Sequence, residues 1–329
     1  MPFSPQRFTS ALPLTMQTFG ENNPDQTFYI IYRDPPGSGF FSNVFHVLGH
    51  IQIAESLGMT PLVDMKHFRT LYNEDSPVAG TENAWQYYFE QLTPYSLDEA
   101  YESKRVIFCD GKFKFQIYED IASASRLTNS YLRVRSEILD KVAVFQRERL
   151  TPGTTLGIHF RGGDQKTAPG HPVCPNPEQM LDKTAWLLSS YPINTIYLVS
   201  EEQRYVDLFV RQFGKRVVFT NAFRTYDDNA YHLRPYPRAN HMYTLGYEVL
   251  FDTLLLANTD YLLASGTGGV ASGSNVSQMA QVLNAGSYKH VELIYNGMNP
   301  PAGASLFSRA VRKGMRLLFS ARRCSQRNV

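Results

Sequence analysis

The chain is poor in cysteine and has no long apolar run. Its three cysteines, Cys109, Cys174 and Cys324, lie far apart in 329 residues and are odd in number. This pattern excludes a disulfide framework and a zinc cluster, and it fits a reducing compartment. The first 20 residues lack the apolar core of a signal peptide, and no apolar stretch reaches the ~20 residues of a membrane span. We therefore expect neither a secretion signal nor a transmembrane helix.

An excess of charge of one sign is also absent, since 32 Lys and Arg stand against 30 Asp and Glu. A net charge of +2 does not indicate a nucleic-acid-binding protein. Only residues 309–329 are biased, with seven basic side chains, no acidic one and interleaved apolar residues. We treat residues 301–329 as a basic amphipathic tail, which fits either a solvated helix or a helix resting on anionic lipid. The expected location is the cytoplasm; if the tail rests on lipid, the protein is expected at the inner membrane face.

Short β-rich runs alternate with longer helical patterns. Strands are predicted at residues 28–33, 61–65, 105–109, 156–160, 195–200, 216–220, 261–264 and 291–295. Helical periodicity covers residues 42–57, 121–149, 177–188, 204–213, 243–256 and 276–283. The strand runs are apolar nearly throughout, as in strands covered on both faces, so an α/β fold with parallel sheets is predicted.

A Pro-Gly segment that begins at Thr151 interrupts this pattern and is the natural domain boundary. We predict an N-terminal α/β domain over residues 1–150 and a C-terminal α/β domain over residues 151–300. The first contains a glycine-rich loop, Gly37-Ser-Gly-Phe-Phe-Ser-Asn43, between a strand and a helix. Glycines let backbone approach a ligand, and amides at a helix start suit an anion, so Gly37, Gly39 and Asn43 are candidate binding residues. A tight turn without a ligand is the alternative.

A second segment, residues 156–165, is a buried strand that leads into His159, Arg161 and Asp164. Ligands bind at the carboxyl ends of parallel strands, and alternation places His159 and Arg161 on one face. The planar guanidinium of Arg161 matches phosphate oxygens. An Arg161–Asp164 ion pair that closes a loop is the alternative.

A third segment, residues 264–277, leaves a strand and enters a helix whose predicted N-cap is Ser274. Small residues, hydroxyls and the positive end of a helix form an anion cradle, so Ser274, Asn275 and Ser277 join the candidates. A capped surface loop is the alternative. Two phosphate-type sites in one domain fit a nucleotide diphosphate, on which the Gly37 loop closes from the other domain.

Together these residues resemble the fucosyltransferase superfamily, which includes core α1,6-fucosyltransferase, the nodulation-factor fucosyltransferase and the protein O-fucosyltransferases. The similarity covers residues 28–70 and 155–285, in the same order. The matching motifs are Gly37-Ser-Gly-Phe followed by His46, His159-Phe-Arg161-Gly-Gly-Asp164, His171-Pro172, Asp252–Leu262 and Ser274-Asn-Val276.

The resemblance implies a GT-B-like fold, in which two Rossmann-like domains face each other across a cleft. The N-terminal domain, residues 1–150, would then lie on the acceptor side, and the C-terminal domain, residues 151–300, would bind the nucleotide sugar. It also implies inverting, metal-independent transfer from GDP-fucose. Position by position, Arg161 would hold the β-phosphate, His159 and Asp252 would read the guanine, and Ser274 would bind phosphate. Two glutamates stand where the family has paired aspartates, and would position Arg161 or the sugar; they are Glu201 and Glu202.

The chain departs from the family pattern in two places. Gly162 replaces a second arginine, and the glutamate taken as base in some members has no match in residues 166–170. Asp164 and His171 are the remaining candidates for a catalytic base. Their alternatives are an orienting role for Asp164 beside Arg161, and a turn position for His171.

The sequence thus predicts a glycosyltransferase that moves fucose from GDP-fucose to a glycan or polysaccharide-precursor acceptor. No metal is expected, because the chain has no Asp-x-Asp triplet. Two alternatives stay open: a transferase of the same fold that uses another nucleotide sugar, and a non-catalytic nucleotide- or glycan-binding module. The aromatic cluster at residues 85–89 fits either a core face or a surface that stacks on an acceptor sugar.

Overall fold

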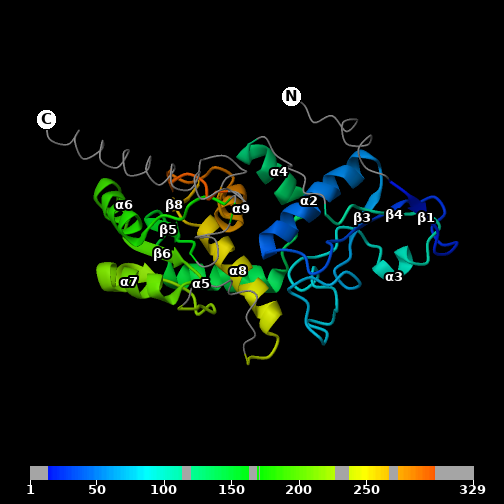
Figure 1. The fold of residues 1–329 in the computed structure, drawn as a ribbon, viewed down its shortest axis with the longest axis horizontal. Helices are drawn as coiled ribbons and strands as arrows, with labels where there is room; N and C mark the ends of the chain where they lie inside the picture. Colours follow the sequence, from blue (N-terminus) through cyan, green and yellow to red (C-terminus); the bar gives the residue numbers. More distant parts are fainter. Residues whose placement is uncertain are drawn as a thin grey trace.

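The computed structural model describes residues 14–112, 120–162, 169, 171–226, 237–266 and 273–300. It contains two sheets, one in each half of the described chain (Figure 1). The first sheet has the strand order β1-β4-β2-β3. Its strands are β1 (Met16–Gln17), β2 (Phe28–Ile31), β3 (Thr60–Val63) and β4 (Val106–Phe108). β2 pairs in parallel with β3 and β4, whereas β1 is antiparallel to β4.

The second sheet is parallel throughout and has the order β7-β6-β5-β8-β9. Its strands are β5 (Thr155–His159), β6 (Thr195–Val199), β7 (Val217–Val218), β8 (Tyr261–Ser265) and β9 (His290–Ile294). The central strands are fully buried, as their continuous apolar runs predict. The edge strand β9 is mostly half-exposed, so the expectation that it is covered on both faces is wrong.

Helices connect the strands and cover the sheets. They are α2 (Phe40–Ser56), α3 (Leu97–Ala100), α4 (Ile121–Tyr131), α5 (Ser136–Arg149), α6 (Pro177–Ser190), α7 (Gln203–Phe213), η2 (Gly214–Arg216), α8 (His241–Ala257) and α9 (Asn275–Asn284). Local signals fix several helix starts: Asn176 and Gln179 form a capping box ahead of α6, and Pro177 occupies its first turn. No helix in the described ranges is long and apolar enough to cross a membrane.

The prediction of one continuous helix over residues 121–149 is wrong, because the structure has two helices there, α4 and α5. The break at residues 132–135 follows from tertiary pairing. Val134 bridges Phe89 in antiparallel fashion, the Arg135 amide donates to the Tyr88 carbonyl (3.0 Å), and the Arg133 carbonyl accepts from the Glu90 amide (2.9 Å). Extended backbone that pairs with a distant segment therefore replaces one turn of helix.

The same pairing buries the aromatic cluster at residues 85–89. Trp85, Tyr87, Tyr88 and Phe89 are at most 2% exposed, which confirms the core alternative for this cluster. These residues form turns rather than a helix.

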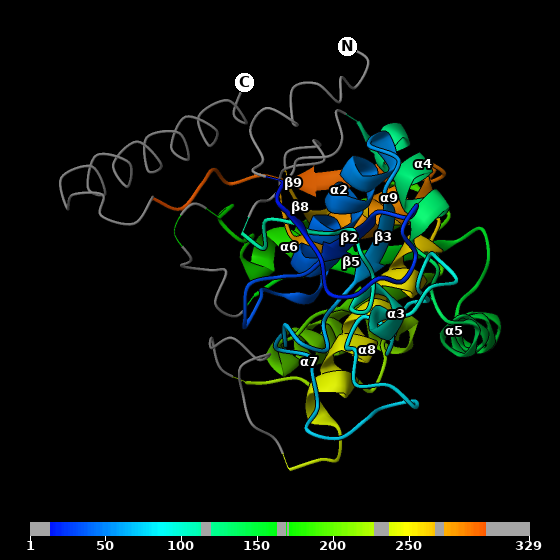
Figure 2. The same ribbon diagram turned by 90° about the vertical axis from the view of Figure 1, so that its right-hand side faces the viewer.

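The two sheets share one hydrophobic core. A single cluster of buried side chains reaches from Tyr29 in β2 to Leu262 in β8. Helices α2, α4 and α9 contact one another, and they lie between the two sheets in Figure 1. Figure 2 shows the same three helices grouped together. The boundary predicted at residues 150/151 falls between α5 and β5, but α5 packs against α8 of the second half. The division into two domains stays a prediction.

Gly246 allows α8 to approach the aromatic residues of the first half. A Cβ atom at this position would overlap the Tyr88 hydroxyl and lie 3.0 Å from Cδ1 of Tyr72. The Tyr88 ring cannot move aside easily, because its hydroxyl donates to the Tyr243 carbonyl (2.9 Å) and its ring stacks on Tyr243 at 5.6 Å.

We therefore expect Gly246→Ala to lower the free energy of unfolding by about 1–3 kcal/mol, the usual cost of overpacking a core. Denaturant unfolding measures this change. Combining it with Tyr88→Phe, which removes the obstructing hydroxyl, should destabilise less than the sum of the two single changes. Additive effects, or a Gly246→Ala variant as stable as the parent chain, would contradict the assigned contact.

Candidate functional site

Arg161 lies at the carboxyl edge of the second sheet, just beyond β5. Its Nη1 atom is 3.0 Å from Oε1 of Glu201, which follows the neighbouring strand β6. The same carboxylate oxygen accepts a hydrogen bond from the Gly162 amide (2.8 Å). The Arg161 side chain is only 13% exposed. Glu201 thus holds a mostly buried guanidinium where ligands of parallel sheets bind.

His159, the last residue of β5, is buried beside this arginine. Within the described part of the chain its Nδ1 atom has no hydrogen-bond partner. Burial, and then the charge of Arg161, lower the pKa of His159 to about 3, so the imidazole is neutral near pH 7. Because buried polar atoms are nearly always hydrogen-bonded, an unsatisfied ring nitrogen here indicates a place for a ligand group.

Asp252 of α8 faces the same strand ends. Its Oδ1 accepts hydrogen bonds from the Tyr197 hydroxyl (2.9 Å) and from Oγ1 of Thr220 (2.7 Å). Burial raises the pKa of Asp252 to about 6, although both hydrogen bonds and the charge of Arg224 act in the opposite direction. The carboxylate is therefore ionised at pH 7 but close to its titration range.

A cavity of about 40 Å³ joins these groups. Its lining includes His159, Arg161, Glu201, Asp252 and Val276. A second cavity of about 310 Å³ adjoins it and shares three lining residues, Ala222, Glu248 and Asp252. Aromatic side chains line the second cavity: Phe145, Phe219, Tyr247 and Phe251. Cationic, anionic and aromatic side chains thus line two neighbouring cavities, a combination typical of small-molecule sites.

The start of α9 reaches the smaller cavity through Val276. Ser274 caps this helix, and its hydroxyl accepts from the Val276 amide at 3.4 Å. Ser277 donates to the Ser274 carbonyl (3.0 Å), and Asn275 is the first helical residue. The glycine-rich residues 267–272 that precede this turn lie outside the described residues.

The glycine-rich loop of the first half is pinned by its own helix. Asn43 accepts a hydrogen bond from the Ser38 amide and donates one to the Ser38 carbonyl, each at 3.0 Å. Gly37 has a φ of +74°, which favours glycine, and Gly39 is the N-cap of α2. Asn43 therefore shapes the loop.

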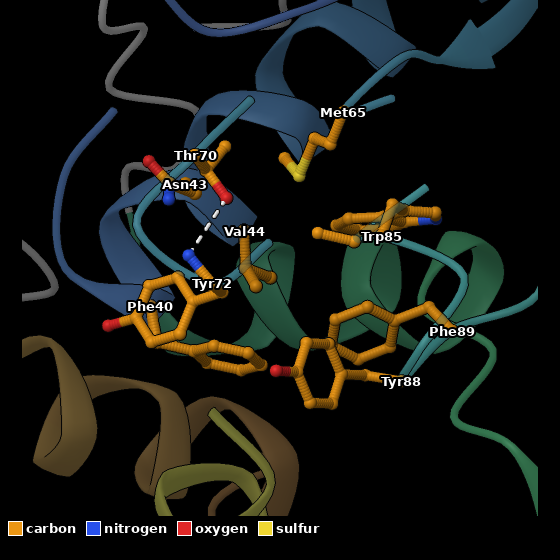
Figure 3. Close-up of a pocket in the computed structure, with 10 residues that line it drawn as sticks. Phe40, Asn43, Val44, Met65, Thr70, Tyr72, Trp85, Tyr88 and Phe89 are labelled. Atoms are coloured by element: carbon orange, nitrogen blue, oxygen red, sulfur yellow. Dashed lines mark hydrogen bonds between the residues drawn. The ribbon is translucent and has the colours of Figure 1, made fainter. Parts of the chain in front are cut away.

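A small aromatic cavity of about 20 Å³ lies beside this loop (Figure 3). Tyr72 lines it, and its hydroxyl accepts from the amide of Phe40, the first residue of α2. Burial raises the pKa of Tyr72, whereas the Phe40 amide and the charge of Arg161 hold it down. The charge of Arg161, at the edge of the second sheet, thus acts on a residue of the first half.

Other predicted residues are placed differently. Glu202 is fully buried, contacts Arg204 and is not part of the cavity lining. A Cβ atom at Gly162 would overlap Oε1 of Glu202, so this glutamate occupies the space that a side chain at position 162 would need. His171 is exposed, and its carbonyl accepts from the Asn299 amide (2.8 Å). Asp164 lies outside the described residues, as does the tail at residues 301–329.

Arg224 was not evident from the sequence. Its Nε donates to the Ser200 carbonyl (3.1 Å), and its Nη1 donates to the carbonyls of Thr220 (2.9 Å) and Ala222 (3.0 Å). It thereby joins the ends of β6 and β7, which carry parts of the cavity. A single arginine in an irregular segment carries no sequence signal for this role.

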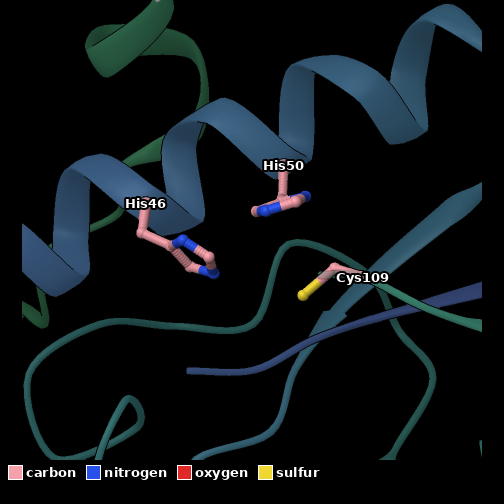
Figure 4. A group of neighbouring side chains, drawn as sticks. All are labelled: His46, His50 and Cys109. Carbon is pink, nitrogen blue, oxygen red and sulfur yellow. The ribbon is translucent and has the colours of Figure 1, made fainter. Parts of the chain in front are cut away.

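A buried cluster of His46, His50 and Cys109 has the side chains of a metal site (Figure 4). However, His46 uses both ring nitrogens, toward Nη1 of Arg33 (3.0 Å) and the Tyr32 carbonyl (2.8 Å). The Cys109 sulfur accepts a hydrogen bond from the Tyr32 amide and donates one to the Tyr32 carbonyl, each at 3.3 Å. Burial raises the pKa of Cys109 to about 12, which disfavours the thiolate that metals bind. These atoms form a hydrogen-bond network.

No protein-family model matches the sequence, and no curated protein does. Solved structures do match. One is the NodZ α-1,6-fucosyltransferase soaked with GDP-fucose, at 17% identity and a TM-score of 0.50, covering 78% of this chain and 93% of that one. Another is the selenomethionine form of fucosyltransferase NodZ from Bradyrhizobium, at 16% identity and a TM-score of 0.52, covering 85% and 98%. The predicted α/β, GT-B-like fold is therefore confirmed: this chain shares the fold of these solved fucosyltransferase structures.

Proposed function

We propose that this protein is a glycosyltransferase that transfers fucose from GDP-fucose to a glycan. The observation that carries the proposal is the cavity at the carboxyl edge of the second sheet, where His159, Arg161 and Asp252 converge. The likeness of most of the chain to solved fucosyltransferase structures, one of them soaked with GDP-fucose, supports the choice of donor.

In this proposal the guanine lies against Asp252 and His159. The ionised carboxylate of Asp252 accepts hydrogen bonds from the N1–H and N2–H₂ groups of the guanine. The Nδ1 atom of His159, which has no partner among the described residues, forms a further hydrogen bond with the base. Arg161 binds the diphosphate, and Glu201 fixes its orientation. The start of α9 at Ser274 adds its amides and partial positive charge on the same side.

The chemical step is displacement at the anomeric carbon of the sugar. As the glycosidic bond lengthens, the diphosphate gains negative charge, and preorganised cations and amides stabilise it where it develops. An acceptor hydroxyl attacks from the opposite face, which inverts the configuration. The base is proposed to be Asp164 or His171. We also propose that the acceptor is a polysaccharide precursor and that the reaction needs no metal. Two further proposals are a cytoplasmic location and membrane contact through residues 309–329.

Calorimetry with GDP and UDP tests the donor assignment. We expect GDP to bind at least about 10-fold more tightly, because Asp252 pairs with two donors that uracil does not present together. Release of GDP from GDP-fucose then tests turnover. Tight UDP binding without GDP binding would point to another nucleotide sugar, and GDP binding without turnover over a panel of acceptors would point to a non-catalytic module.

A further inference from the structure

Among the described residues, Arg33 is a buried cation whose contacts include no counter-charge. It follows β2 and is 6% exposed. Its Nη1 contacts Nδ1 of His46 (3.0 Å) and the carbonyls of Gly111 (3.3 Å) and Lys112 (3.5 Å), and its Nη2 donates to Oγ of Ser38 (3.5 Å). These partners are a ring nitrogen, two backbone carbonyls and a hydroxyl, and none is a carboxylate.

The carboxylates of Asp34 and Asp110 act on Arg33 from a distance and do not form ion pairs with it. Burial lowers the pKa of Arg33, and the negative charges of these two residues act against this effect. Asp34 instead faces the ammonium of Lys112, at 3.7 Å. Arginine stays protonated in proteins, so a full positive charge is held under the surface. Burying a charge without a close partner costs several kcal/mol in general, which makes this arrangement unusual for a purely structural residue.

This charge lies directly beneath the glycine-rich loop. Ser38, which Arg33 contacts, is the central residue of Gly37-Ser38-Gly39. The Cγ atom of Arg33 is 3.5 Å from the position a Cβ would take at Gly37. The loop leads into the start of α2, whose positive end adds to the same field. Phe40, which follows the loop, and the charge of Arg161 both act on the Tyr72 hydroxyl.

We propose that Arg33 supplies the second positive charge for the diphosphate, in place of the family arginine that Gly162 replaces. The inference rests on the proposed function. Arg33 is a positioning residue: it fixes Ser38 from below, and its charge attracts the anion toward the loop amides. The bound diphosphate is the counter-charge that this guanidinium lacks among the described residues.

The test uses the full chain with Arg33→Met and Arg33→Gln, which remove the charge, and Arg33→Lys, which keeps it. Calorimetry with GDP, guanosine and inorganic pyrophosphate separates binding of the anion from binding of the base. We expect the two neutral variants to bind GDP and pyrophosphate about 10-fold more weakly, and to bind guanosine as the parent chain does. Arg33→Lys should keep most of the affinity. Arg69→Met is the matched control, because Arg69 is half-exposed and paired with Asp75.

Equal GDP affinity in the parent chain and a folded neutral variant would overturn the inference. So would an equal loss of guanosine and GDP binding, which indicates a merely structural role. If Arg33→Met does not fold, Arg33→Gln decides, since its amide can still bond to Ser38 and His46. If the parent chain binds pyrophosphate but not GDP, the proposed function fails, whereas the pyrophosphate comparison still decides the role of Arg33.

Discussion

Replacing Arg161 with alanine is expected to slow release of GDP from GDP-fucose by about 100- to 1000-fold, the usual cost of removing one group that stabilises developing negative charge. The structure makes this residue hard to replace. Its guanidinium is 13% exposed and is held by Glu201 at the end of a buried strand. Steady-state kinetics and GDP calorimetry measure the effect on the transition state and on binding.

The alanine variant also leaves Glu201 buried and without its cation, and an unpaired buried charge destabilises the fold by itself. The double variant Arg161→Ala, Glu201→Gln is therefore the matched control: it should recover thermal stability but not activity. If the double variant releases GDP as fast as the parent chain, Arg161 does not bind the departing diphosphate.

Replacing Asp252 with asparagine is expected to weaken GDP binding by about 10- to 100-fold and to stabilise the free protein. Asparagine is nearly isosteric, and its Oδ1 can still accept from Tyr197 and Thr220. It lacks the charge that pairs with two guanine donors. The gain in stability follows from burial, which raises the pKa of Asp252 from 3.8 to about 6. That shift corresponds to a decrease of at most about 3 kcal/mol in the free energy of unfolding when Asp252 is ionised.

The sign of the pH dependence follows from the same shift. Because the folded pKa is above the unfolded one, Asp252 costs no stability below pH 3.8, and the cost grows up to about pH 6 and is constant above it. GDP binding needs the ionised carboxylate, so affinity should be highest above pH 6 and fall as pH decreases through this value. Calorimetry on either side of this pH measures the difference.

Asp207→Asn is the control for Asp252→Asn, since Asp207 is exposed on α7 of the same half. It should change neither affinity nor its pH dependence. An Asp252→Asn variant that binds GDP with the parent affinity at neutral pH would remove Asp252 from the guanine site. A loss of stability in that variant would contradict the desolvation argument.

The buried strands were predictable because their signal is local. A run of apolar residues such as Leu156–Phe160 requires cover on both faces, and in a parallel sheet its carboxyl end points to one edge. His159 and Arg161 could therefore be placed together without any tertiary information. The same reasoning located the start of α9 at Ser274, because capping is a short-range hydrogen bond.

By itself, then, the sequence determined the α/β class, the order of the buried strands and the arginine at the strand end. The tertiary structure alone decided three other features: the break between α4 and α5, the space that Glu202 takes at Gly162, and the burial of Arg33. Each depends on contacts between residues far apart in the sequence, which a local pattern does not predict. An example is the hydrogen bond that Arg33 donates to the Gly111 carbonyl. Hydrophobic periodicity describes how one segment is solvated, and it contains no information about which distant partner will fill the space beside it.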